Sequence, residues 1–266
     1  MYIHQIPEWP EFYIDWPEVN PLLACVRSQH RKLLEQAEAL DAKRFSYLVD
    51  LRVQRNGPRL GKTHSASKRV EAVMRDAIDN CAEPLTKERL IQWNNDLFSI
   101  GRESSRKPVR TDWRDDLFAP TFVGCNTPYG QVEEQFEPPL AEGLDHEMKN
   151  FIAWFNTPND SEGVIRAAVA HLWFVTIHSF SNGNGRLARV ITDMMLACAD
   201  ATSYRYYSMS HQIVKERDSY NSVLERTQRG TLDITEWIAW FLECFEHTIA
   251  RSEKILPAAS AEERFW

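Results

Sequence analysis

The feature that most constrains this chain is a polar, glycine-bearing stretch between two long apolar runs. Residues 178–189 read HSFSNGNGRLAR, and the residues before them, 161–177, are apolar at helical spacing. Residues 187–198 continue with the same spacing. The first N–H groups of a helix have no internal partner and carry the positive end of the helix dipole. The stretch therefore predicts an anion-binding loop that leads into a helix.

The loop and the two arginines after it have the composition of a phosphate site. Gly183 and Gly185 let backbone N–H groups turn towards a ligand at no steric cost, and Asn184 tolerates a left-handed conformation. Arg186 and Arg189 are expected in the first turn of the following helix, where each cation costs about 0.3–1 kcal/mol. The pair indicates an anion of high charge, such as a polyphosphate. A structural turn with two solvated arginines is the less favoured alternative.

The same stretch also matches a dinucleotide-binding fingerprint. Residues 183–188 fit G-x-G-x-x-[G/A], and residues 172–177 have the composition of a buried strand. However, the apolar run reaches back to Val164 at helical spacing, which is too long for one strand. Residues 203–209 carry no acidic residue to bind a ribose, and no series of strand–helix alternations surrounds the motif. We expect the fingerprint to be accidental.

The stretch resembles the signature of the Fic family, H-x-F-x-[D/E]-G-N-G-R-x-x-R. Its fixed positions are occupied by His178, Phe180, Gly183, Asn184, Gly185, Arg186 and Arg189. Residues 206–217 resemble the next segment of the family. Residues 2–16 resemble the helical domain often fused ahead of bacterial Fic cores. The resemblance implies an all-α, Fic-type helical bundle with one small β-hairpin.

The resemblance also implies an activity. Fic enzymes usually transfer AMP from ATP to a Ser, Thr or Tyr hydroxyl of a target protein. His178 would be the catalytic base, since an imidazole titrates close to working pH. The phosphates would bind Asn182, Gly183, Asn184, Gly185, Arg186 and Arg189, with Arg186 on the β-phosphate and Arg189 on the γ-phosphate. Weaker candidates for neighbours of the adenine are Tyr207, Tyr220, Asn221 and Gln228.

One position departs from the family pattern and weakens the expected metal site. Asn182 stands where the family has an acidic residue that helps to hold Mg²⁺. An amide oxygen supplies a dipole but no charge, so Asn182 would bind the metal weakly and transfer would be slow. Asp193 and Glu216 are the nearby acids that would substitute. Two alternatives stay open: a catalytically impaired nucleotide-binding protein, or a transferase using CDP-choline, UTP or the phosphate of ATP.

Regulation also departs from the family. Many Fic proteins carry an inhibitory helix, [S/T]-x-x-x-E-[G/N], whose glutamate pairs with the second motif arginine. Here the nearest match, residues 67–72, contains Glu71 but lacks the final Gly or Asn. We expect Glu71 to be an ordinary solvated residue of a helix. A separate regulator and a homodimer are left open.

The remaining elements follow from periodicity and turn residues. Residues 1–21, rich in proline and aromatic residues, predict an extended arm pinned by its rings. Helices are expected over residues 22–40, 70–78, 86–98, 144–155, 161–177, 187–198 and 235–255, with a loop over 56–65 and caps at Thr86 and Ser161. We divide the chain into an N-terminal helical domain (1–83), a Fic core (84–255) and a C-terminal tail (256–266).

Two short runs capable of β structure flank a turn ahead of the motif. Residues 122–125 and 132–136 surround residues 126–130, which predicts a hairpin. By resemblance this hairpin is the flap that holds the target chain by backbone pairing, through Val132, Glu133, Glu134 and Gln135. A surface hairpin without a partner is the alternative.

Composition excludes some classes of function. A net charge of −7 without a Lys/Arg-rich run argues against a nucleic-acid binder. The 5 cysteines have neither zinc nor disulfide spacing, which favours a reducing compartment. No signal peptide and no apolar run of ~18 residues is present, so we expect a soluble, cytoplasmic protein with no membrane contact.

Overall fold

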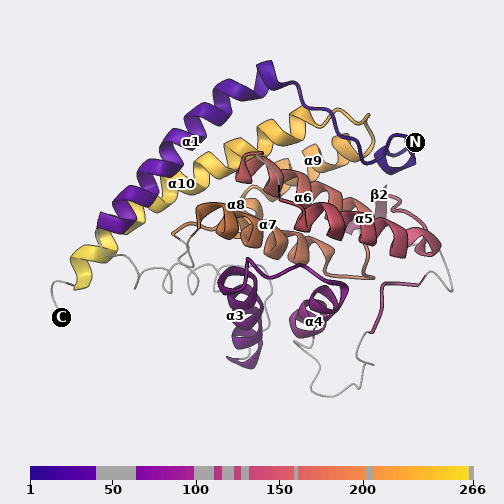
Figure 1. The fold of residues 1–266 in the computed structure, drawn as a ribbon, viewed down its shortest axis with the longest axis horizontal. Coiled ribbons are helices and arrows are strands. Elements are labelled where there is room, and N and C mark those ends of the chain that lie inside the picture. Colours follow the sequence, from indigo (N-terminus) through magenta and orange to yellow (C-terminus); the bar gives the residue numbers. More distant parts are fainter. Residues whose placement is uncertain are drawn as a thin grey trace.

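The structure is a computed structural model that describes residues 1–39, 64–98, 111–115, 123–126, 132–158, 161–201 and 206–263. It is a bundle of helices, as the sequence predicts (Figure 1). Its helices are α1 (Trp16–Ala39), α3 (His64–Asp79), α4 (Lys87–Phe98), α5 (Leu144–Asn156), α6 (Gly163–Ile177), α7 (Asn184–Asp200), α8 (Met209–Lys215), α9 (Arg217–Gln228) and α10 (Thr235–Glu263). Short 3₁₀ helices span Ile3–Gln5 and Ala141–Gly143.

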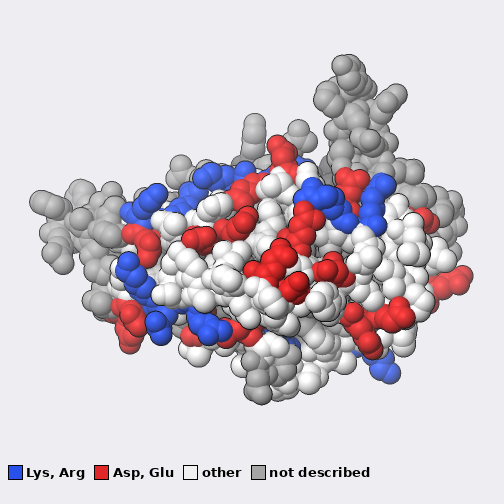
Figure 2. Space-filling view, turned by 90° about the horizontal axis from the view of Figure 1, so that it is seen from above, with Lys and Arg blue, Asp and Glu red and all other residues white. Residues whose placement is uncertain are grey.

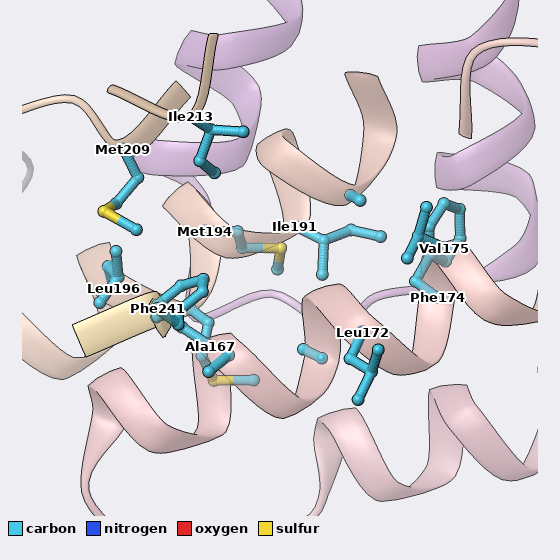
Figure 3. Packing of buried hydrophobic residues seen from close by; sticks show 14 of the residues in the cluster. Ala167, Leu172, Phe174, Val175, Ile191, Met194, Leu196, Met209, Ile213 and Phe241 are labelled. Carbon is cyan, nitrogen blue, oxygen red and sulfur yellow. The ribbon is translucent and has the colours of Figure 1, made fainter. Parts of the chain in front are cut away.

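Helix α6 forms the centre of the bundle and is buried along most of its length. It packs chiefly against α7, and α5 and α10 cover its other sides. Figure 3 shows side chains of the two helices in the shared core, among them Leu172, Ile191 and Met194. Burying each such side chain stabilises the fold by about 1.5–3 kcal/mol. The loop that joins α6 to α7 is therefore held between two well-packed helices, and the strand that a dinucleotide fingerprint requires is not formed.

The N-terminal arm packs by its aromatic rings, as predicted. Trp9 and Phe12 meet Trp173 of α6 edge to face, with ring centroids 6.3 and 6.0 Å apart. The backbone of Tyr13 adds two hydrogen bonds, to the oxygen of Leu232 at 2.8 Å and from the N–H of Ile234 at 3.0 Å. Beyond the arm, α1 runs alongside α10 on one side of the molecule (Figure 1).

Several helix ends differ from the sequence-based expectation. Helix α1 starts at Trp16 rather than at residue 22. Pro17 lies in its first turn, where a backbone N–H has no partner in any case, and Pro21 is accommodated inside the helix. Helix α3 starts at His64 rather than at residue 70. Helix α10 continues beyond Ile255 to Glu263, so most of the predicted tail is helical. Helices α8 and α9 occupy a segment for which no element was predicted.

The two predicted helix caps have different outcomes. Thr86 caps α4, because its Oγ1 accepts a hydrogen bond from the N–H of Arg89 at 3.2 Å. The prediction that Ser161 caps α6 is wrong. Glu162 occupies the N-cap position and makes no capping hydrogen bond with its side chain.

Two short strands precede α5. Strand β1 (Val123–Asn126) pairs antiparallel with β2 (Val132–Phe136), and Cys125 lies opposite Glu133. The ring of Phe136 is buried and meets the ring of Tyr2 edge to face at 5.1 Å. The end of β2 is thus fixed to the N-terminal arm, whereas residues 127–131 lie outside the described part of the chain.

The surface carries charges of both signs. Figure 2 shows acidic and basic side chains interspersed on the face seen from above. Among the helices that the structure describes, none combines the length and the apolar character that crossing a membrane requires. Cys25, Cys81, Cys198 and Cys244 are free thiols.

The close approach of α6 and α7 gives a test of this packing. A Cβ added at Gly163 would lie 2.1 Å from the Cβ of Ala199, so Gly163→Ala must push the two helices apart. We expect this overpacking to lower the free energy of unfolding by about 1–3 kcal/mol, measured by urea denaturation.

Gly143→Ala is the matched control, because a Cβ there meets nothing within 4 Å and the residue has a φ of −87°. Its free energy of unfolding should stay within about 0.5 kcal/mol of the parent. Equal stability of the two variants would contradict the packing described for α6 and α7.

Candidate functional site

The loop between α6 and α7 is bounded by two residues with left-handed backbones. His178 ends α6 with φ 53° and ψ 50°, while its N–H still donates to the oxygen of Phe174 at 3.2 Å. Gly183 caps α7 with φ 94°. Only glycine adopts such a conformation at no cost, and a non-glycine residue there stores about 1–3 kcal/mol of strain. His178 is held in this conformation by its surroundings.

Asn184 closes the loop with its side chain. Its Oδ1 accepts a hydrogen bond from the N–H of Phe180 at 3.0 Å, and its Nδ2 donates to the oxygen of Phe180 at 2.6 Å. Phe180 itself is fully buried and meets Trp113 edge to face. Asn184 does not take the left-handed conformation that its residue type tolerates, because Gly183 takes it and Asn184 is the first residue of α7.

The start of α7 presents free backbone donors. The first hydrogen bonds of the helix come from the N–H groups of Arg186 and Leu187, both to the oxygen of Gly183, at 2.9 and 3.0 Å. The N–H groups of Gly183, Asn184 and Gly185 have no acceptor among the described residues. Three free donors at a positive helix end form a cradle for an anion.

Two half-buried arginines flank this cradle. Burial removes water from the guanidinium groups of Arg186 and Arg189 and so lowers the pKa of both. An anionic ligand would supply the interactions that this water no longer provides. Nη1 of Arg189 lies 3.8 Å from the point that a Cβ of Gly185 would occupy, so the guanidinium folds back over the first turn. The sequence analysis expected Arg189 in the first turn of the helix. Because α7 begins at Asn184, Arg189 stands in the second turn instead.

His178 is half-buried beside this cradle. Burial and the positive charge of Arg114 lower its pKa to about 4, against which a hydrogen bond with the backbone of Val175 acts. The ring is therefore neutral at pH 7. A neutral ring that donates one N–H to a backbone carbonyl keeps its second nitrogen free to accept a proton, as a general base requires.

Arg114 fixes the turn that carries His178, and sequence reasoning missed it. Its backbone N–H donates to the oxygen of Ser179 at 2.9 Å, and its Nε donates to the oxygen of His178 at 2.8 Å. Its Nη2 donates to the oxygen of Pro139, and the side chain is buried. Arg114 lies in a polar, irregular stretch, and no local pattern marks it.

The loop between α6 and α7 contains no carboxylate, so the side chain of Asn182 is the metal ligand that the sequence analysis proposes there. Asn182 is exposed, and its backbone oxygen accepts a hydrogen bond from Nδ2 of Asn94 at 3.1 Å. Asp193 follows Asn184 by nine residues (184 to 193) and lies about 13 Å further along α7. Glu216 contacts Nδ1 of His247 at 2.8 Å. Neither acid reaches the loop, and the described chain holds no cluster of 3 or more His, Cys, Asp or Glu suited to a metal.

The four adenine candidates do not share one location. Tyr207 is misassigned, because its hydroxyl donates to Asp200 at 2.6 Å, at the far end of α7. That end is about 24 Å from the loop. Gln228 donates to Thr176 at 3.1 Å, and Asn221 is half-buried on α9. Tyr220, also on α9, is buried, and its hydroxyl contacts Nε2 of His171 at 3.1 Å.

The remaining candidates concern regulation and target binding. Glu71 accepts a hydrogen bond from Arg75 at 3.0 Å, one turn along α3, and among the described residues it makes no ion pair with Arg189. Residues 132–135 form most of β2, but their side chains lie outside the description. Their role as a target-binding flap stays a prediction.

Comparison with known proteins adds a second line of support. Residues 84–196 match the model of the Fic/DOC family. The protein adenylyltransferase Fic of Nematostella vectensis is 30% identical over 116 residues, which are 42% of this chain and 25% of that protein. A probable protein adenylyltransferase of Aquifex aeolicus is 20% identical over 127 residues, 45% of this chain and 37% of that one. The match thus spans well under half the length of these relatives.

Solved structures share the fold. A Fic family protein of Desulfovibrio desulfuricans superimposes with a TM-score of 0.63, at 16% identity, over 91% of this chain and 76% of its own. Residues 134–508 of Fic-1 from C. elegans give a TM-score of 0.56 with the same identity and coverage. At this identity the likeness supports the fold alone.

The environment of His178 leads to a prediction about its protonation. In ligand-free protein, an NMR titration of the ring should give a midpoint near pH 4, well below the ordinary 6.5. Replacing Arg114 by Gln should raise the midpoint, because a nearby positive charge is removed. Arg226→Gln, which removes an exposed arginine paired with Glu236, should leave it unchanged.

The same shift links stability to pH. Between pH 6.5 and about 4 the unfolded chain protonates this histidine, whereas the folded protein keeps it neutral. The unfolded state then binds more protons, so stability should fall as the pH decreases through this window. A midpoint near 6.5 in the parent protein would contradict the buried environment described for His178.

Proposed function

We propose that the chain, whose residues 84–196 match the Fic/DOC family model, transfers AMP from ATP to a hydroxyl side chain of a target protein. The observation that carries the proposal is the juxtaposition at the start of α7. Three free N–H groups and two half-buried arginines lie beside an imidazole that is neutral at pH 7. The names of the relatives, protein adenylyltransferases, support the same reaction class.

The proposed reaction uses each of these groups once. A Ser, Thr or Tyr hydroxyl of the target attacks the α-phosphorus, and its proton moves to the free nitrogen of His178. The bond from the α-phosphorus to pyrophosphate breaks. The N–H groups of residues 183–185, with Arg186 at the β-phosphate and Arg189 at the γ-phosphate, stabilise the negative charge that grows on pyrophosphate.

The rate of this reaction depends on Asn182. An amide at this position gives Mg²⁺ no charged ligand from the loop, and the described residues contain no cluster of 3 or more His, Cys, Asp or Glu that could hold a metal by itself. We therefore propose a slow enzyme whose positive charge at the phosphates comes mainly from the two arginines and the helix end. No step of the proposed reaction requires a metal that the protein itself holds.

The target would bind at the strand pair. Strand β2 ends at the buried Phe136, close to Pro139, whose oxygen accepts a hydrogen bond from Arg114. A target segment that pairs with β2 would be aligned with His178, because Arg114 donates hydrogen bonds both to Pro139, just after the strand, and to the backbone of His178. In this proposal residues 1–83 form a helical domain packed on the Fic core of residues 84–255, with residues 256–266 as a C-terminal extension.

A second function of another class is favoured by the same Asn182. With a cradle for phosphates but a poor metal site, the protein would bind nucleotide without transferring it. The two functions make opposite predictions for catalysis and the same prediction for nucleotide binding.

Labelling with α-³²P-ATP separates the two functions. We expect slow transfer of label to protein by the parent, and a loss of about 100-fold or more in His178→Ala, because the base is removed. His146→Ala, at an exposed histidine on α5, is the matched control and should label like the parent. Asn182→Asp should raise the Mg²⁺-dependent rate by restoring a charged ligand.

Equal labelling by the parent and His178→Ala would remove His178 from the mechanism. A parent that binds ATP but transfers no label, and that gains transfer only as Asn182→Asp, would establish the binding function instead.

A further inference from the structure

Helix α4 reaches the loop between α6 and α7 through the buried side chain of Asn94. Its Nδ2 donates a hydrogen bond to the backbone oxygen of Asn182 at 3.1 Å, across 88 residues of sequence. Asn94 is 1% exposed, and among the described residues its Oδ1 has no hydrogen-bond partner. A buried amide oxygen without a donor lowers the stability of the fold. The contact with the loop is therefore what this side chain contributes.

The position of Asn94 is fixed by the packing of α4 against α3. The indole Nε1 of the preceding residue, Trp93, donates to Oδ2 of Asp76 on α3 at 2.7 Å. Arg89, earlier in α4, donates to the same carboxylate oxygen through Nε at 2.9 Å. Trp93 is also buried in the core. Asn94 thus stands on a rigid element outside the loop, from which it can orient a group of the loop.

The hydrogen bond from Asn94 sets the direction of the next N–H group. The peptide between Asn182 and Gly183 is trans, as nearly all non-proline peptides are. In a planar trans peptide the C=O and N–H bonds point in opposite directions. Because the oxygen of Asn182 is directed at α4, the N–H of Gly183 points away from α4. This N–H is one of the three free donors of the cradle.

The backbone of Gly183 does not select this orientation by itself. Rotating the peptide by half a turn would change φ of Gly183 from 94° to a negative value, and glycine populates both regions about equally. The rotated peptide would direct the oxygen of Asn182, instead of the N–H, into the cradle. A carbonyl oxygen there would repel a phosphate, so the rotation removes a donor and adds a repulsive group.

The other hydrogen bonds of the loop do not hold this peptide. Upstream, the side chain of Asn184 bonds the N–H and the oxygen of Phe180. Downstream, the first hydrogen bonds of α7 end on the oxygen of Gly183. Neither set involves the oxygen of Asn182 or the N–H of Gly183. The orientation of the peptide that joins them therefore depends on Asn94.

We propose that Asn94 is a positioning residue that keeps the N–H of Gly183 directed into the anion cradle. The inference rests on the proposed function, in which this N–H binds a phosphate of ATP. Asn94 itself contacts no phosphate in this proposal and acts through the peptide alone. A hydrogen bond of ordinary net strength biases an equilibrium between two orientations by about 2- to 10-fold.

Asn94→Leu tests the proposal by separating ligand affinity from stability. Leucine has the same branching, removes the unpartnered Oδ1 and favours a helix, while the exposed Asn182 can bond to water. We expect a midpoint of urea denaturation equal to or above that of the parent. Calorimetry should show the affinities for ATP and for inorganic pyrophosphate about 2- to 10-fold weaker. The smaller Asn94→Ala should lose the same affinity, so crowding by leucine is not the cause.

Asn156→Leu is the matched control. Asn156 also links two segments through the backbone, because it bonds the N–H and the oxygen of Leu85, each at 2.8 Å. It shares a cavity with Gly163 at the start of α6, whereas the loop lies about 20 Å away at the other end of α6. Asn156→Leu should lower the midpoint of urea denaturation and leave the affinities for ATP and pyrophosphate unchanged.

A crystal structure of ligand-free Asn94→Leu decides the orientation without any nucleotide. The proposal predicts that the peptide between Asn182 and Gly183 is rotated, or present in both orientations, with a negative φ of Gly183 in the rotated form. A single orientation with φ near 94° would overturn the inference, whatever the protein binds.

The binding data separate this inference from the proposed function. Parent protein that binds ATP, with Asn94→Leu and Asn94→Ala binding it equally well, would overturn the inference and leave the function standing. Parent protein that binds no ATP, together with a rotated peptide in Asn94→Leu, would overturn the function and support the orienting role of Asn94.

Discussion

The pair of hydrogen bonds between the side chain of Asn184 and the backbone of Phe180 is the contact on which the site depends. It closes the segment from the end of α6 to the start of α7 on itself, with the amide of Asn184 buried in the centre. With Asn184 used in this way, the left-handed turn falls to Gly183, and the N–H groups that follow stay unpaired. An anion site is thus present before any ligand binds, and its ordering cost is met by the packing of α6 against α7.

Two buried polar side chains connect elements of the bundle near this loop. Arg114 binds the backbone at His178 and Ser179 and so fixes the strained turn from which the imidazole projects. His171, on α6, contacts Thr192 of α7 and Tyr220 of α9. Arg114 acts on the charge of the site as well as on its shape, because it lowers the pKa of His178. Unpaired buried groups are costly, so each of these side chains constrains its neighbours.

The sequence predicts the parts of the site that are local and not those that depend on distant contacts. The glycines, His178 and the two arginines lie within twelve residues, and the apolar periodicity on both sides places them at a helix start. Arg114 reaches His178 across a separation of 64 residues, and His171 reaches Tyr220 across 49, so no local pattern indicates either. Tyr207 shows the converse error, since proximity in sequence to the motif suggested a contact that the length of α7 prevents. The prolines misled in a similar way, because Pro17 and Pro21 both lie within α1, where the composition of residues 1–21 indicated an extended arm.

The most direct measurement is a crystal structure of the protein with a non-hydrolysable ATP analogue. The account predicts phosphate oxygens within hydrogen-bond distance of the N–H groups of residues 183–185, Asn184 still bonded to Phe180, and the free nitrogen of His178 facing the α-phosphorus. Nucleotide bound elsewhere with the start of α7 unoccupied, or a loop in which Asn184 has left Phe180, would contradict it.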